Sequence, residues 1–240
     1  MNTCKNCNEP INGNFCANCG QPTNVKKIDK NYLIQEVKEF FSGNKGLIYT
    51  VKKVAVNPGE SVRQFIAEDR YRFVKPITFL FIASLVYAIV SSLFNISTAD
   101  FFEQADDAYE SSIGTFISTW IFENPGYSNL IVGLFMAFWM KLFFRKAGYN
   151  LFEIFILLCF VTGIMTLLST IGIAVRGLTN FNILYLMLIE ITYLTWAVGQ
   201  FFDKKKVSSY VKAFLAYSCG FLVMMILIVI ITAVEVAIRH

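Results

Sequence analysis

Five long apolar blocks constrain the fold of this chain more than any other feature of its sequence. They extend over residues 77–94, 130–144, 151–175, 181–202 and 214–238. A transmembrane helix needs about 20 predominantly apolar residues. Four blocks have a suitable length, and the second gains it by beginning near Asn129, with Lys141 and Arg145 reaching toward the interface. The pattern predicts an all-α polytopic membrane protein with about five transmembrane helices, which occupy residues 77–240.

The composition excludes a soluble globular fold. Of the 240 residues, 55% are hydrophobic and only 16% are charged. Ordinary soluble domains have an apolar share of about 45–50% and about 25% charged residues. The apolar excess is concentrated in the five blocks, as expected for helices that face lipid.

Lysine and arginine are distributed unevenly along the chain. Residues 1–76 contain 12 of the 21 basic residues, residues 95–128 contain none, and four lysines lie between Lys204 and Lys212. Cytoplasmic loops carry the excess of basic residues, and with five spans every basic cluster falls on one side. The polar N-terminal segment also lacks the apolar core of a signal peptide. We expect the N-terminus in the cytoplasm and the C-terminus outside it.

Four cysteines near the N-terminus have the spacing of a zinc site, Cys4-x2-Cys7-x8-Cys16-x2-Cys19. Two C-x-x-C pairs allow four thiolates to reach one ion in a tetrahedral arrangement. Disulfides or a redox-active thiol pair are the alternative, but stable disulfides are rare in the cytoplasm. The spacing predicts a small Cys4 zinc-ribbon module over residues 1–25 that binds structural Zn²⁺.

Residues 26–76 lie between this module and the first apolar block. They contain three short amphipathic stretches, which begin near Asp29, Gly46 and Glu60 and are too short and too charged to span a membrane. Two placements remain open for these stretches. Their basic faces suit an anionic inner leaflet, and their apolar stripes suit packing on one another or on the cytoplasmic end of the bundle.

Three cations, Arg70, Arg72 and Lys75, directly precede the first apolar block. They can contact lipid phosphates at the membrane surface, and Pro76 suits the first turn of the following helix. The simpler interpretation is an anchored helix start. A specific binding site for a phospholipid headgroup is the alternative.

The order of several motifs resembles a known family. The cysteine knuckles are followed by Lys45-Gly46-Leu47-Ile48-Tyr49-Thr50, then by Asn57-Pro58-Gly59-Glu60, and then by Arg70-x2-Phe73-x2-Pro76. Over residues 1 to about 95 this order is similar to that of the bacterial family catalogued as domain of unknown function 3667. The resemblance implies a multi-pass protein of the bacterial inner membrane, and it supplies no activity.

Apolar residues recur at helical spacing between the first two blocks, with acidic residues on the opposite face. This pattern predicts an amphipathic helix near residues 100–122 that lies on the outer side. Because its polar face is acidic, we expect it to cap the bundle or touch a partner rather than bind anionic lipid.

Glu190 is the ionisable residue expected near the middle of the membrane. It lies nine residues into the fourth block, about 13 Å deep at 1.5 Å per residue. The third block carries Thr166, Ser169 and Thr170 on a small polar face, and the short connection between the two blocks predicts an antiparallel hairpin. We expect Glu190 to face these hydroxyls. It acts either as a proton or substrate relay or as a protonated acid in one interhelical hydrogen bond.

No arrangement of residues points to catalysis. The only histidine is His240, and the chain has neither a phosphate-binding glycine loop nor a carboxylate pair at helical spacing within a block. The single basic residue before position 26 also argues against binding of nucleic acid. Besides the phospholipid bilayer, we therefore expect a cytoplasmic protein partner, recruited by a membrane-anchored adaptor or regulator through its zinc module. The alternative is a small permease or lipid-handling protein that works through Glu190.

Overall fold

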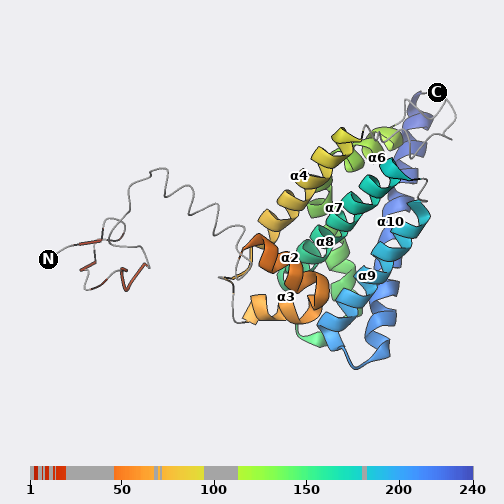
Figure 1. The fold of residues 1–240 in the computed structure, drawn as a ribbon. Coiled ribbons are helices and arrows are strands. Elements are labelled where there is room, and N and C mark those ends of the chain that lie inside the picture. The colour runs from red at the N-terminus through yellow and green to blue at the C-terminus, as the bar shows by residue number, and fades with distance from the viewer. Residues whose placement is uncertain are drawn as a thin grey trace. The chain divides into compact units, whose positions relative to one another are not determined.

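The computed structural model describes residues 3–4, 7, 9–10, 13, 15–19, 46–67, 70, 72–94, 113–179 and 183–239. They fall into two compact units, Met1–Ser42 and Gly43–His240. The second unit is all-helical within its described residues (Figure 1). The described part of the first unit is the cysteine module, which is presented with the candidate sites below.

Five long helices form the bundle of the second unit. They are α4 (Pro76–Leu93), α7 (Pro125–Phe143), α8 (Leu151–Leu178), α9 (Ile183–Asp203) and α10 (Val207–Arg239). All five are long and apolar enough to cross a membrane. The prediction of an all-α fold with five candidate membrane spans is therefore confirmed.

Two helix starts differ from the apolar blocks. The second long helix, α7, begins at Pro125 rather than near Asn129, because a proline suits the first turn of a helix and fixes its start. The last helix, α10, begins at Val207 rather than near residue 214. Hydropathy identifies only the apolar part of a helix. The first turns of α10 are polar, so the helix begins before the apolar block does.

α8 lies at the centre of the bundle and packs against α4, α7 and α9. Of the most apolar stretch of α8, 50% is buried by the rest of the protein, whereas the corresponding share for α10 is 11%. One reason for the close packing is Gly163, where an added Cβ would lie 2.6 Å from the ring of Phe79 in α4. A small residue at a helix interface lets the two backbones approach, as in many membrane bundles. α10 packs on α9, α7 and α6 (Ile113–Glu123).

Two short helices, α2 (Leu47–Val56) and α3 (Pro58–Ala67), pack against the bundle. Their apolar stripes are buried: Val54 and Val62 are 0% exposed, in one core with Phe160 of α8 and Phe201 of α9. Figure 1 shows both helices beside the part of the bundle where α4 begins and α9 ends. Of the two placements that the sequence leaves open, α2 and α3 adopt packing on the bundle.

Two predicted helices fall partly or wholly outside the described residues. The stretch that begins near Asp29 lies outside them. Of the amphipathic helix predicted near residues 100–122, the structure describes only α6 from Ile113 onward. Ser128 in α7 donates a hydrogen bond of 2.9 Å to the carbonyl oxygen of Ile121, so α6 is fixed to the start of the next span.

Candidate functional site

The four N-terminal cysteines are brought together as the spacing predicts. Their Sγ atoms all lie within 4.8 Å of one another, with Cys4 and Cys19 at 3.5 Å and Cys7 and Cys16 at 3.5 Å. None of the four is joined to another cysteine by a disulfide. Four sulfur atoms at these distances can surround one metal ion in a tetrahedral arrangement. The prediction of a possible Cys4 metal site is confirmed, and the donor set is of the kind that binds zinc.

Without a metal ion, the crowded thiols favour their protonated form. The hydrogen bond with the backbone of Glu9 lowers the pKa of the Cys7 thiol, whereas burial and the hydrogen bonds with the other three thiols raise it, giving a pKa of about 12. A thiolate is hard to form among neighbouring thiols unless a positive charge stabilises it. A metal ion at the centre of the cluster would supply that charge and displace the protons.

The second candidate site is a cavity in the bundle that Glu190 of α9 helps to line. The Ser169 hydroxyl of α8 donates a hydrogen bond to the Glu190 carboxylate. The Thr166 hydroxyl lies 3.3 Å from the Asn129 side-chain nitrogen, which donates to it. Thr170 is buried but does not line this cavity, and its hydroxyl donates to the Thr166 carbonyl oxygen in the same helix at 2.8 Å. The structure thus brings Glu190, Ser169 and Thr166 to one cavity.

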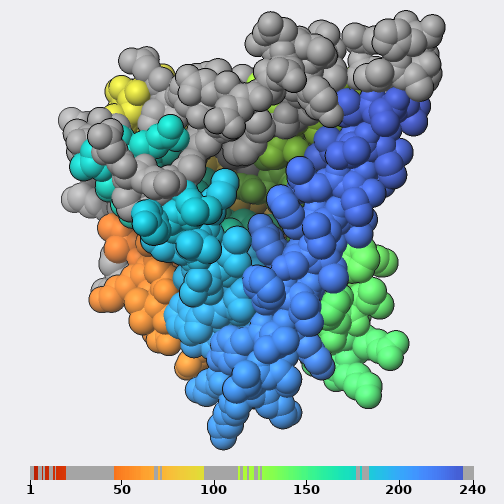
Figure 2. Space-filling view, turned by 90° about the vertical axis from the view of Figure 1, so that its right-hand side faces the viewer, coloured from red at the N-terminus to blue at the C-terminus, as the bar shows by residue number. Residues whose placement is uncertain are grey.

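The cavity has a volume of about 270 Å³ and takes residues from six helices. In Figure 2 the surface is hollowed between α9 and α10, with residues of earlier helices visible at the bottom of the hollow. Met136, Leu158 and Leu194 form apolar parts of the wall. The polar side chains that line it are Tyr87, Ser128, Asn129, Thr162, Thr166, Ser169, Glu190 and Tyr217.

Most of the hydroxyl protons around this cavity are already used inside the protein. Ser128 donates to Ile121 at 2.9 Å, Thr162 to Leu158 at 2.7 Å and Thr166 to Thr162 at 2.9 Å, each to a backbone oxygen. A hydroxyl whose proton is engaged can offer only its oxygen lone pairs to a ligand. The described lining residues include one carboxylate and no lysine, arginine or histidine. The cavity is therefore electron-rich.

Sequence reasoning did not single out Asn129, Tyr87 or Tyr217 as parts of this site. Each is a single polar residue in an apolar helix, and residues of these types also occur at membrane interfaces and in helix contacts without forming a site. Which of them meet depends on how α4, α7 and α10 are arranged around α8, and no local pattern encodes that arrangement. Their approximate depth in the membrane was the only signal available from the sequence.

The motif at the start of α2 contacts the Arg70-x2-Phe73-x2-Pro76 motif that precedes α4. Gly46 has a φ of 83°, which favours glycine, and its N–H donates to the Arg72 carbonyl oxygen at 2.9 Å. The Thr50 hydroxyl donates to the Gly46 carbonyl oxygen at 2.8 Å and accepts from the Val74 N–H at 2.9 Å. The motif that begins α2 therefore holds the segment that leads into α4.

The Asn57-Pro58-Gly59-Glu60 motif contacts the end of α9. The Gly59 N–H donates to the Gln200 side-chain oxygen at 2.8 Å. Arg63 donates to the carbonyl oxygens of Gln200 and Phe201 at 2.7 Å each, two of the groups that a helix end leaves without an intrahelical partner. We call these three hydrogen bonds the α3–α9 clamp. The clamp joins residues about 140 positions apart.

The three cations before α4 are exposed. The Arg72 guanidinium lies 4.7 Å from the centroid of the Tyr49 ring, and Arg70 donates to the Ile66 carbonyl oxygen at 3.1 Å. Lys75 directly precedes the first residue of α4. Two of the three therefore also contact protein. A specific headgroup site at these residues remains a prediction.

Together these features define a class: a multi-pass membrane protein with a cysteine cluster that can hold a metal ion. Residues 44–88 match the family described as Protein of unknown function (DUF3667), so the family that the sequence resembles is confirmed over this segment. The matched segment contains the junction around Gly46, the α3 side of the clamp and the first part of α4. No curated protein and no solved structure matches the chain.

Proposed function

We propose that the membrane bundle binds a proton or a small cation in the cavity around Glu190 and works as a small permease. The observation that supports this proposal is the electron-rich cavity of about 270 Å³, which six helices line. An acid in a membrane interior is costly unless it is paired, protonated or facing a polar cavity. Glu190 has both a hydroxyl partner and a polar cavity, so a cation can be exchanged there without exposing the carboxylate to lipid.

The size of the cavity narrows the substrate class. Pockets for drug-sized ligands have volumes of about 300–1,000 Å³, so a cavity of about 270 Å³ lies just below that range and suits a small ligand. The oxygen atoms of Asn129, Thr162 and Thr166 can serve as additional ligands for a cation or for a protonated amine. The volume of the cavity therefore favours a small cation over a lipid as its ligand.

The proposal includes a location. The distribution of basic residues supports an orientation with the N-terminus in the cytoplasm, and the family resemblance favours a bacterial inner membrane. In that orientation the wall of the cavity formed by Ile121, Ser128 and Asn129 lies toward the outer side. A cation would then reach Glu190 from the outer side of the membrane, on which the acidic segment 95–128 lies.

A stability assay with a cation panel tests the proposal. Thermal unfolding of the purified protein is measured with Na⁺, K⁺, methylammonium and a series of pH values, for the wild type, Glu190→Gln and Thr192→Val. Thr192 is an exposed α9 residue that does not line the cavity, so Thr192→Val is the matched control. We expect at least one cation to raise the unfolding temperature of the wild type and the control but not of Glu190→Gln. Equal behaviour of all three proteins would refute the proposal.

A second candidate function, that of a membrane-anchored adaptor or regulator, is favoured by the cysteine cluster. A closed Cys4 site with zinc is structural, so it would hold the N-terminal module in one fold that a partner could recognise. A pull-down from detergent with the wild type and the Cys4→Ser/Cys7→Ser double variant tests it. A stoichiometric soluble protein bound only by the wild type supports the adaptor, and identical bound proteins in both samples argue against it.

A further inference from the structure

A second cleft lies at the far end of α9 from the Glu190 cavity. It has a volume of about 460 Å³ and is formed where α7 ends, at the 3₁₀ helix Arg145–Ala147, and at the turn between α9 and α10. Four basic side chains line it: Arg145, Lys146, Lys206 and Lys212. The hydroxyl-bearing residues Ser208 and Ser209 also line the cleft.

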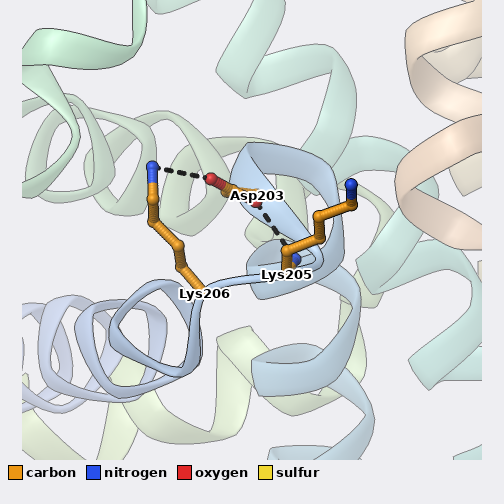
Figure 3. Close-up of polar contacts among 3 residues, drawn as sticks. All are labelled: Asp203, Lys205 and Lys206. Atoms are coloured by element: carbon orange, nitrogen blue, oxygen red, sulfur yellow. Dashed lines mark hydrogen bonds and ion pairs between the residues drawn. The ribbon is translucent and has the colours of Figure 1, made fainter.

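The positive charge of this cleft is not neutralised from within. Its only acidic lining residue is Asp203, whose carboxylate pairs with the Lys206 ammonium at 2.9 Å and accepts the Lys205 backbone N–H at 3.0 Å (Figure 3). The other three cations are exposed, and within the described residues none of them forms an ion pair with an acid. Like charges gathered in one concave site favour an anion.

The floor of the cleft is apolar and well packed. The rings of Phe144 and Phe202 stack with centroids 3.7 Å apart and an interplanar angle of 5°, and Phe144 is buried. Phe144 directly follows the candidate membrane span Gly126–Phe143, and Phe202 lies near the end of the span Leu184–Asp203. The cleft is therefore at the depth where a lipid headgroup meets its acyl chains.

We propose that this cleft binds a phosphate group, held by Arg145, Lys146 and Lys212 with the hydroxyls of Ser208 and Ser209. Guanidinium and ammonium groups form charge-assisted hydrogen bonds with phosphate oxygens, and hydroxyls complete such sites. The same chemistry fits the headgroup of an acidic phospholipid and free inorganic phosphate. The site is separate from the Glu190 cavity, and none of its lining residues is shared with that cavity.

The test compares three proteins and two probes. The wild type, the Arg145→Gln/Lys146→Gln/Lys212→Gln variant and a control with the same charge loss, Lys52→Gln/Lys204→Gln/Lys205→Gln, are purified. Lys205 is a suitable control because its ammonium points away from Lys206 in Figure 3. Each protein is placed in phosphatidylcholine nanodiscs, with or without phosphatidylglycerol, and separately titrated with inorganic phosphate. Binding is measured as the shift in unfolding temperature and as phosphatidylglycerol retained on purification.

We expect phosphatidylglycerol or phosphate to stabilise the wild type and the control. Each charge-assisted hydrogen bond from a cation of the cleft to the phosphate contributes roughly a tenfold change in affinity, so the variant that lacks all three cations should bind at least on the order of a hundredfold more weakly, whereas the control keeps these bonds. An effect of phosphatidylglycerol alone assigns a lipid headgroup, and an equal effect of inorganic phosphate assigns the free anion. The proposal is overturned if neither probe stabilises the wild type or if the two triple variants respond alike.

Discussion

The α3–α9 clamp makes Gly59→Ala the sharpest structural prediction. A Cβ added at Gly59 would lie 2.5 Å from the Gln200 carbonyl carbon and 2.5 Å from the Phe201 nitrogen. These are backbone atoms of a helix, so they cannot rotate away as a flexible side chain can. To restore an ordinary contact of 3.4 Å or more, α3 and α9 must separate by 3.4 − 2.5 = 0.9 Å.

That separation would break the hydrogen bonds of the clamp. Arg63 donates to the carbonyl oxygens of Gln200 and Phe201 at 2.7 Å, and the Gly59 N–H donates to Gln200 at 2.8 Å. A shift of 0.9 Å along these bonds lengthens them to about 3.6 Å, beyond hydrogen-bonding distance. Three bonds at about 1 kcal/mol each give a loss of about 3 kcal/mol. If α3 and α9 do not separate, the overpacked contact itself destabilises the protein by a similar amount, about 1–3 kcal/mol.

Alanine has a better helix propensity than glycine by about 1 kcal/mol, which offsets part of this loss. We therefore expect Gly59→Ala to lower the free energy of unfolding by about 2 kcal/mol. For a chain of this size such a change lowers the unfolding temperature by about 4–8 °C. Unfolding of purified protein in one detergent, followed by circular dichroism, measures the shift.

Gly133→Ala is the matched control. It places the same methyl group in a long helix, where the nearest side-chain atom, in the Phe155 ring, is 3.6 Å away, an ordinary contact. We expect its unfolding temperature to stay the same or rise. If Gly59→Ala is as stable as Gly133→Ala, the close approach of α3 to α9 is not a feature of the folded protein, and the account of the clamp fails.

Three further predictions concern other parts of the chain. Purified protein should contain about one zinc per chain, with loading that falls at low pH because protons compete for the thiolates, and Cys16→Ser should lose the metal, as elemental analysis would show. Glu190→Gln should fold with little loss, whereas Glu190→Leu leaves Ser169 without its partner and should cost about 0.6–1.7 kcal/mol in unfolding assays; equal stability of the two variants would contradict the described contact. A cysteine introduced at Asp106 should react with an impermeant thiol reagent added outside cells and one at Lys205 should not, and the reverse labelling would overturn the proposed orientation.

Some of this architecture could be predicted because the membrane imposes it. Spans must be long and apolar, so five helices could be identified by hydropathy alone. Depth along a span also follows from residue number, so Glu190 could be related to the hydroxyls of the preceding helix through a short connection. The CxxC pairs were equally informative, because two tight turns that each present two thiols leave few alternatives to a shared metal ion.

Contacts between distant segments could not be predicted in this way. The amphipathic stripes of α2 and α3 fit lipid and protein equally well, and only the structure shows Val54 and Val62 in the bundle core. Nothing local to Arg63 indicates that it caps the end of α9. The cleft around Lys212 was also missed, because a cluster of lysines after a span is already explained by the positive-inside rule. The rule predicts the side of the membrane on which the lysines lie, and it does not predict that they line a concave site.

The most direct test of the cation proposal is to observe the Glu190 carboxyl group itself. Infrared difference spectra of the protein in lipid are recorded as each cation of the panel, including the proton, is added to the wild type and to Glu190→Gln. The proposal predicts that one cation changes the C=O stretch of a buried carboxyl in the wild type and that this change is absent from Glu190→Gln. A carboxyl signal that no cation alters, or one that persists in Glu190→Gln, would contradict it.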